Sequence, residues 1–96
     1  MSKVILKGYI VVPEDELTIV IQELETHKKL TLQEPGCLLF SVTQSPDEPT
    51  KFDVYEEFAN RAAFENHQLR VRESKWGAVT QNVERFYEII TRKAAQ

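Results

Sequence analysis

Residues 3–12, KVILKGYIVV, are nearly all aliphatic or β-branched, and the run stops at Pro13. Their loose alternation is typical of a strand that is buried to some extent on both faces. Pro13 is followed by three acidic residues at 14–16, and negative charge in a first turn stabilises the positive end of a helix dipole. The stretch therefore predicts a first strand that leads directly into a helix.

The helix after Pro13 is expected to run to about residue 32, because Pro35 cannot continue a helix and Gly36 tolerates the turn that follows. Side chains recur along it at spacings of three and four, as in an amphipathic helix. The stripe predicted to face inward contains Leu17, Val20, Ile21, Leu24 and Lys28.

The middle of the chain has the pattern of a hairpin. Residues 38–44 (LLFSVTQ) and 51–58 (KFDVYEEF) both alternate, and the segment between them is rich in turn residues. Asn60 is a candidate N-cap for a second helix, in which Ala63, Phe64, His67 and Val71 share one face.

The second helix is expected to break near residues 70–72 and to resume at Trp76. Residues 84–91 return to strand character, and residues 92–96 read as a frayed tail. The order βαββαβ predicts a ferredoxin-like α+β sandwich with a four-stranded antiparallel sheet.

Length and composition describe one small domain spanning residues 1–96, with a core at about 3–91. Twelve basic against 15 acidic residues leave a net charge of −3, which argues against a nucleic-acid partner. No stretch has the length of a membrane span or of a signal peptide, so a cytoplasmic protein is expected. The single cysteine and the lack of zinc spacing predict neither a disulfide nor a metal site.

Apolar side chains occupy both faces of the predicted sheet. In the first strand one face carries Ile5, Tyr9 and Val11, and the other carries Val4, Leu6, Ile10 and Val12. In the last strand Phe86 and Ile90 lie on one face, and Tyr87 and Ile89 lie on the other. Helices can cover only one face, and a monomer seldom exposes a large apolar patch. We therefore expect a homodimer that packs through its sheet faces.

Several short blocks follow one another along the chain: EPGCL at 34–38, FSV at 40–42, VYEEF at 54–58, AF at 63–64, then His67 and Trp76. In this order and spacing they resemble the antibiotic biosynthesis monooxygenase domain over residues 3–91. The resemblance implies a dimeric ferredoxin-like fold, or dimeric α+β barrel, with a small-molecule pocket between sheet and helices. Some members oxidise anthrones or quinols with molecular oxygen and without metal or flavin, some degrade haem, and some relatives isomerise a phosphorylated sugar.

The chain departs from the family pattern at informative positions. Arg72 stands where many members carry a second histidine, which argues against a mechanism that needs two imidazoles. Haem degraders place a tryptophan where this chain has His67, and they carry an early strand asparagine where it has residues 7–9 (KGY). Haem is therefore disfavoured, and no cofactor is expected.

His67 and Glu56 are the candidate catalytic residues. His67 lies on the inward stripe of the second helix, and an imidazole can accept a proton from a phenol or an enol. Glu56 alternates with apolar residues, so its carboxyl group needs a hydrogen-bond partner or takes a raised pKa. It either orients His67 or a substrate hydroxyl, or it makes a structural bond to an arginine or a backbone amide. The alternative for His67 is a partly buried histidine that is hydrogen-bonded to a strand carbonyl or to the facing chain of a dimer.

Five further residues are candidates for substrate binding. Tyr9 and Tyr55 stand on strands and offer a hydroxyl to an oxyanion, although strand tyrosines also simply pack. Phe64 and Trp76 either cover a flat aromatic substrate or belong to the core. Arg72, with Arg70, either holds a substrate anion or makes surface ion pairs.

Three functions are compatible with these residues. The first is a cofactor-independent monooxygenase that oxidises a small quinol- or polyketide-like aromatic with dioxygen and a histidine base. The second is a proton-transferring isomerase in which His67 moves a proton while Arg70 or Arg72 holds a phosphate. The third is a non-catalytic dimeric ligand-binding or stress-related module.

Overall fold

The computed structural model describes residues 2–93 and contains the expected succession of strands and helices. A single 3₁₀ turn, Glu14–Glu16, precedes the first α-helix. The elements are β1 (Ser2–Val11), α1 (Leu17–Leu32), β2 (Cys37–Gln44), β3 (Lys51–Phe58), α2 (Arg61–Glu73), α3 (Lys75–Val79) and β4 (Glu84–Lys93).

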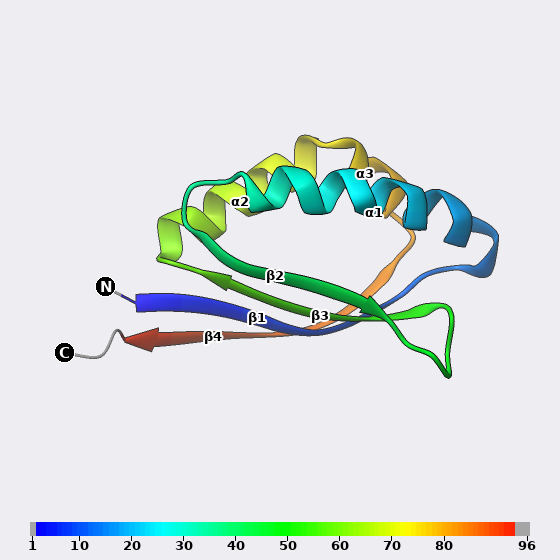
Figure 1. Ribbon diagram of the computed structural model, residues 1–96, viewed down its shortest axis with the longest axis horizontal. Helices are drawn as coiled ribbons and strands as arrows, with labels where there is room; N and C mark the ends of the chain where they lie inside the picture. The colour runs from blue at the N-terminus through cyan, green and yellow to red at the C-terminus, as the bar shows by residue number, and fades with distance from the viewer. Residues whose placement is uncertain (1, 94–96) are drawn as a thin grey trace.

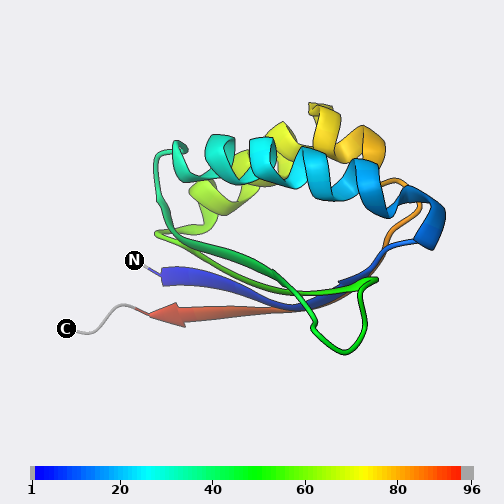
Figure 2. The same cartoon turned by 45° about the vertical axis from the view of Figure 1, so that its right-hand side comes forward.

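The four strands form one antiparallel sheet in the order β2-β3-β1-β4. Figures 1 and 2 show α1, α2 and α3 in one layer over the same face of this sheet, and the β2–β3 hairpin loop pointing away from the helices. The predicted ferredoxin-like α+β sandwich is confirmed. Its opposite face carries no helix formed by residues 2–93.

Side-chain caps set the start of α2 and its boundary with α3, and the second of these differs from the prediction. Asn60 caps α2 as predicted, since its side-chain oxygen accepts a hydrogen bond from the Ala63 amide at 2.8 Å. The break expected near residues 70–72 is wrong and lies at Ser74. There the hydroxyl donates to the Val71 carbonyl at 2.7 Å and accepts from the Gly77 amide at 3.2 Å, so one side chain ends α2 and caps α3.

The last strand is longer than predicted, because β4 continues through Lys93 in register with the start of β1. The predicted frayed tail at 92–96 is therefore wrong for residues 92 and 93. Residues 94–96 lie outside the described part of the chain.

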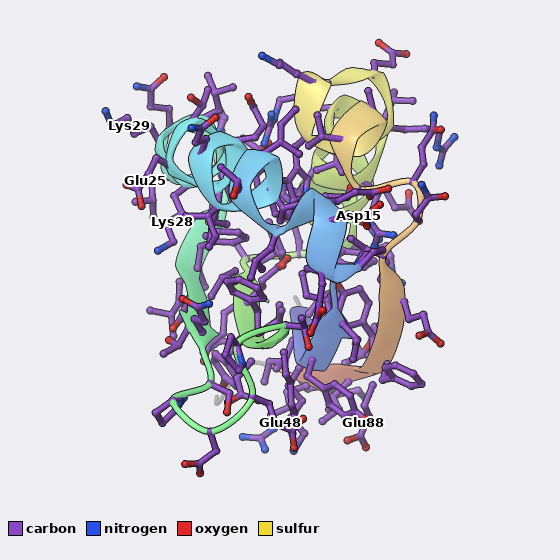
Figure 3. The ribbon with its side chains drawn as sticks, turned by 90° about the vertical axis from the view of Figure 1, so that its right-hand side faces the viewer. Asp15, Glu25, Lys28, Lys29, Glu48 and Glu88 are labelled. Atoms are coloured by element: carbon purple, nitrogen blue, oxygen red, sulfur yellow. The ribbon has the colours of Figure 1, made fainter. Side chains whose placement is uncertain are left out.

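The inward stripe of α1 is rotated from the predicted one. Ile21 is exposed and Lys28 is only half-buried, whereas His27 and Thr31 are buried together with Val20 and Leu24. Figure 3 shows α1 and the α2–α3 segment side by side over the sheet, with Glu25 and Lys29 pointing outward from α1. This rotation brings a histidine, rather than a lysine, to the interior.

The core lies between the helices and the sheet, and Val4 and Leu6 of β1 are among its members. Phe58 and Phe64 meet edge to face in it, with ring centroids 5.6 Å apart. Among the residues that the structure describes, members of this core come from every strand except β4, and no helix packs extensively on β4. Tyr87 and Ile89 on β4 therefore stay partly exposed on the helix side.

We call the helix-free side of the sheet the open face. Its central residues alternate with the core residues along each strand, and include Lys3, Ile5, Lys7, Tyr9, Leu39, Tyr55, Glu57, Phe86, Glu88 and Ile90. Tyr9 stacks on Phe86 with ring centroids 4.8 Å apart. The two-sided apolar pattern read from the sequence is thus present, although ion pairs such as Lys3–Glu57 are interspersed.

No helix within residues 2–93 is both long enough and apolar enough to cross a membrane.

Candidate functional site

A small cavity lies between the sheet and the helices. Its volume of about 20 Å³ offers room for about one water molecule or one hydroxyl group. Two of the side chains around it are titratable and buried, Glu56 and His27, and most of the others are apolar or aromatic. The lining residues are Ile10, His27, Phe40, Val42, Val54, Glu56, Trp76 and Tyr87.

Glu56 enters the cavity from the middle of the sheet. It lies on β3, directly between Leu6 of β1 and Phe40 of β2, and is 7% exposed. Its Oε1 atom has no hydrogen-bond partner among the described residues. Burial, and next the negative charge of Glu34, raise the pKa of Glu56 to about 7. Glu56 therefore exchanges a proton near neutral pH, unlike an ordinary carboxyl group.

His67 lies directly behind Glu56 rather than in the cavity wall. It is 3% exposed, and its Nε2 atom is 3.6 Å from Oε1 of Glu56, which is longer than a hydrogen bond. Its Nδ1 atom is 2.8 Å from Oε1 of Glu34. An ionised carboxylate only accepts, so Nδ1 donates and Nε2 is left to face Glu56. Burial lowers the pKa of His67, and Glu34 opposes that effect.

Glu34 is fixed on its other side by Arg70. The Nε atom of Arg70 donates to Oε2 of Glu34, and its Nη2 atom donates to the Thr31 hydroxyl at 3.0 Å. The turn that carries Glu34 packs closely on α2, because a Cβ at Gly36, where φ is +87°, would be 2.6 Å from Cβ of Ala63. The result is a continuous row from Arg70 through Glu34 and His67 to Glu56.

His27 is the second titratable residue of the cavity and is 4% exposed. Its ring stacks on Trp76, with centroids 4.7 Å apart and an interplanar angle of 4°, and meets Phe40 edge on. Its Nδ1 atom has no partner among the described residues. Burial first, then the charges of His67 and Arg70, lower the pKa of His27 to about 3, so this imidazole is neutral at physiological pH.

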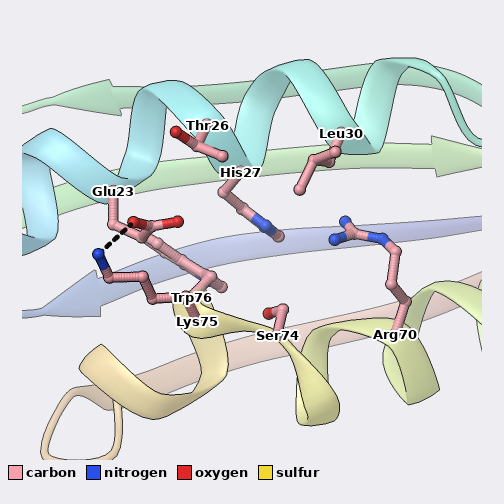
Figure 4. A pocket seen from close by; sticks show the side chains of 8 residues that line it. All are labelled: Glu23, Thr26, His27, Leu30, Arg70, Ser74, Lys75 and Trp76. Carbon is pink, nitrogen blue, oxygen red and sulfur yellow. Dashed lines mark ion pairs between the residues drawn. The ribbon is translucent and has the colours of Figure 1, made fainter.

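A separate cleft of about 360 Å³ lies above this cavity, between α1 and the α2–α3 segment. Figure 4 shows His27 and Arg70 pointing toward each other across it, and an ion pair between Lys75 and Glu23 at 3.7 Å. His27 and Trp76 line both the cleft and the cavity. The stacked pair therefore borders both spaces.

The predicted substrate-binding residues do not all gather here. Trp76 lines the cavity, whereas Phe64 belongs to the core against Phe58. Tyr9 and Tyr55 lie on the open face, where the Tyr55 hydroxyl donates to Glu57 at 2.6 Å.

The two arginines are also separated. Arg72 is exposed and borders another hollow, together with Gln68 and Arg85. Arg70 is bonded to Glu34 and Thr31 and so contributes to the row behind Glu56. The structure thus brings Glu56, His67 and Trp76 together, and it leaves Arg72 outside their surroundings.

The sequence analysis did not identify His27 as a site residue. It placed Glu34 only in a family motif and in the turn after the first helix. A signal for His27 existed, because Val20, Leu24, His27 and Thr31 continue one stripe at spacings of four, three and four. The role of Glu34 had no local signal, since its partners lie 33 and 36 residues further along the chain. Within residues 2–93, no group of three or more His, Cys, Asp or Glu side chains is arranged to hold a metal ion.

The profile of the antibiotic biosynthesis monooxygenase family matches residues 4–76. The chain belongs to this family. Family membership supports a monooxygenase at the level of the family and confirms the resemblance read from the sequence blocks. A search of curated proteins found no match.

Solved structures repeat the same fold at low sequence identity. A Bacteroides thetaiotaomicron protein of unknown function, described as a possible oxidoreductase, has 19% identity and a TM-score of 0.80, covering 94% of this chain and 97% of its own. A Nitrosomonas europaea protein that carries the family's name has 20% identity and a TM-score of 0.76, covering 97% and 89%. MupZ from Pseudomonas fluorescens has 19% identity and a TM-score of 0.71, covering 92% and 69%. At these identities the likeness concerns the fold alone.

Proposed function

We propose that this member of the family is a cofactor-independent monooxygenase that oxidises a small quinol- or anthrone-like aromatic with dioxygen. The observation that carries the proposal is the buried carboxyl group of Glu56. Its Oε1 atom has no hydrogen-bond partner among residues 2–93, and Glu56 lines a cavity of mostly apolar and aromatic residues with His67 behind it. Such a group is suited to take a proton from a weakly acidic substrate near neutral pH.

The proposed chemistry balances with dioxygen as the only co-reactant. Loss of a proton from a phenol or an activated CH₂ group makes the substrate an electron-rich anion, which gives one electron to dioxygen. The resulting radical and superoxide combine to form a carbon–oxygen bond, and loss of water from the peroxide leaves a carbonyl group. One oxygen atom enters the product, and the other leaves in water with the two hydrogens that the substrate loses.

The residues divide these tasks. Glu56 accepts the substrate proton and returns it to the departing hydroxide. His67 holds its unprotonated Nε2 atom toward Glu56, and the bonds from Glu34 and Arg70 keep the ring in that orientation. Trp76 and Phe40 keep water from the reactive anion. The roles are thus exchanged relative to the sequence reading, in which His67 was the base.

No observation among residues 2–93 favours the isomerase alternative. It needs a free cation for the substrate phosphate, but the Arg70 guanidinium is bonded to Glu34 and Thr31. Arg72 borders a different hollow from the one that contains Glu56.

Dioxygen consumption with menadiol and with anthrone tests the proposed function. We expect uptake above the autoxidation blank with at least one of them, and a product that contains one oxygen atom from labelled dioxygen. Menadiol would give a hydroxylated menadione and water, and anthrone would give anthraquinone and water. Uptake equal to the blank with both substrates, or release of hydrogen peroxide without oxygen insertion, contradicts the proposal.

We further propose that two chains pack through their open faces. Phe86 is 45% exposed and Leu39 is 44% exposed on that face, next to Ile90 and the ring of Tyr9. Exposed aromatic and aliphatic side chains on a face that no helix covers favour a protein partner, and a second copy offers the same surface.

Light scattering after size exclusion tests the dimer. We expect twice the chain mass of 11.1 kDa at micromolar concentration. Phe86→Glu is expected to halve the measured mass, because it places a charge in the apolar contact, whereas Glu25→Ala on the outer side of α1 should leave the mass unchanged. A monomeric wild type would rule out this assembly.

A further inference from the structure

Two residues that line the small cavity, His27 and Glu56, each have a buried polar atom whose hydrogen-bonding capacity is unused. Nδ1 of His27 and Oε1 of Glu56 are both buried and both lack a partner among residues 2–93. Most buried polar groups in proteins are hydrogen-bonded, and leaving one unpaired costs about 1–3 kcal/mol. Two such atoms at one cavity indicate a polar group that the protein is built to receive.

We propose that His27 is a substrate-positioning residue, and that the cavity binds one neutral hydroxyl group, attached to an aromatic ring, between Nδ1 of His27 and Oε1 of Glu56. This deepens the proposed function, on which its catalytic meaning rests, by adding a second contact to the substrate. The unused atoms come from α1 and β3, so the contact exists only in the folded chain.

The size and chemistry of the cavity select a hydroxyl group. About 20 Å³ accommodates one oxygen atom and its hydrogen, but not a carboxylate or a phosphate. A hydroxyl group both donates and accepts. It can donate to an ionised Glu56 while accepting from Nδ1–H of His27, or donate to Nδ1 while accepting from a protonated Glu56. An ammonium group only donates, so it can satisfy both atoms only when Glu56 is ionised, and an ether only accepts, so it can satisfy both only when Glu56 is protonated. A hydroxyl group satisfies both atoms with either form of Glu56, so the comparison with an ether is made at about pH 8, where Glu56 is mainly ionised.

The surrounding side chains favour an aromatic ring as the carrier of that hydroxyl. Phe40, Trp76 and Tyr87 line the cavity, and the planar stack of His27 on Trp76 faces the outer cleft as well. The cavity itself is too small for a ring. Because His27 and Trp76 line both the cavity and the cleft shown in Figure 4, the ring would lie on the side of that cleft while its hydroxyl group occupies the cavity.

Phenol and anisole form the test pair, because they differ only by methylation of the oxygen. Trp76 is the only tryptophan of the chain and lies against His27, so its fluorescence reports binding at this cavity. Excitation at the red edge of the tryptophan band avoids absorption by either ligand. The titrations are made without dioxygen, which separates binding from any oxidation.

We expect phenol to bind with a dissociation constant about tenfold lower than that of anisole, as two buried hydrogen bonds would require. His27→Phe keeps an aromatic ring against Trp76 but removes the nitrogen, and should bring the two ligands within about twofold of each other. Glu56→Leu should do the same by an independent route. Lys29→Ala, on the exposed side of α1, should keep the wild-type preference.

Glu56→Gln separates this inference from the proposed function. An amide can donate to and accept from a hydroxyl group, so this variant should still prefer phenol, although it cannot take the proton. Equal binding of phenol and anisole by the wild type, no saturable binding of phenol, or a preference retained in both His27→Phe and Glu56→Leu would overturn the role of His27. Failure of oxygen uptake alone would overturn only the monooxygenase proposal.

Discussion

Glu56→Gln should lower kcat/KM for the oxidised substrate by about 10²- to 10³-fold, within the range that general acid–base catalysis contributes. Glutamine keeps the size of the side chain in the cavity but cannot accept a proton from the substrate. The residual rate would reflect the apolar site and the bound geometry alone. Dioxygen uptake with the substrate found in the menadiol and anthrone assay measures the loss.

The pH profile of the wild type gives a second readout of the same residue. Catalysis needs the ionised form of Glu56, and its pKa is raised to about 7 by burial. The blank-corrected kcat/KM should therefore rise about tenfold per pH unit below 7 and level off above it. Glu56→Gln should lose this rise, because the group that titrates has been removed.

Glu57→Gln is the matched control for Glu56→Gln. Glu57 is the next residue of β3, points to the open face, and is bonded there to Lys3 and Tyr55. Its replacement removes an identical carboxyl group from the opposite side of the sheet and should leave the rate within about twofold of wild type. Equal losses in the two variants, or a full rate in Glu56→Gln, would reject Glu56 as the proton acceptor.

Gly8→Ala should lower the free energy of unfolding by roughly 3–5 kcal/mol, the largest stability change that we expect from one added methyl group. Gly8 lies on β1 with φ of +151°, and a Cβ there would be 1.9 Å from the Phe86 carbonyl oxygen. The backbone of β1 or β4 must therefore shift, which breaks hydrogen bonds of this strand pair. Backbone strain at the positive φ adds to the loss.

Thermal and urea unfolding measure the effect of Gly8→Ala. For a domain of this size the melting temperature should fall by about 15–30 °C. Lys29→Ala, at an exposed position of α1 away from the open face, is the control and should change stability by less than about 0.5 kcal/mol. A Gly8→Ala variant as stable as Lys29→Ala would mean that the two strands separate at this point without loss of stability.

Secondary structure was predictable because its signals are local. The alternation of residues 51–58, the proline before α1 and the Asn60 cap each act within a few residues. The end of α2 was misplaced by a few residues because Ser74 looks like an ordinary polar residue until its hydroxyl is seen to bond both Val71 and Gly77. The family was also readable, since its blocks carry both residue type and spacing.

The candidate site was predictable only in part. The alternation of β3 placed Glu56 among core residues, and the stripe of α2 placed His67 inward. The sequence did not show which of these two residues faces the cavity, because that depends on how α2 packs over the sheet. Tyr9 lies on the open face because it pairs with Asp53 and Phe86, and the side chains of paired residues lie on the same face of a sheet.

Taken alone, the amino-acid sequence determined the strands, the helices, their order and the family, because each follows from side-chain periodicity or from a motif of neighbouring residues. Tertiary packing decided that His27 rather than Lys28 turns inward, that Arg70 holds Glu34, and that Glu56 faces the cavity. Adjacent helix positions are about 100° apart, so the contacts of α1 with the sheet and its neighbouring helix select which residue is buried. The polar row joins residues that are far apart in the chain, and only the folded chain brings Glu34 within hydrogen-bond distance of His67 and Arg70, which lie 33 and 36 positions further on.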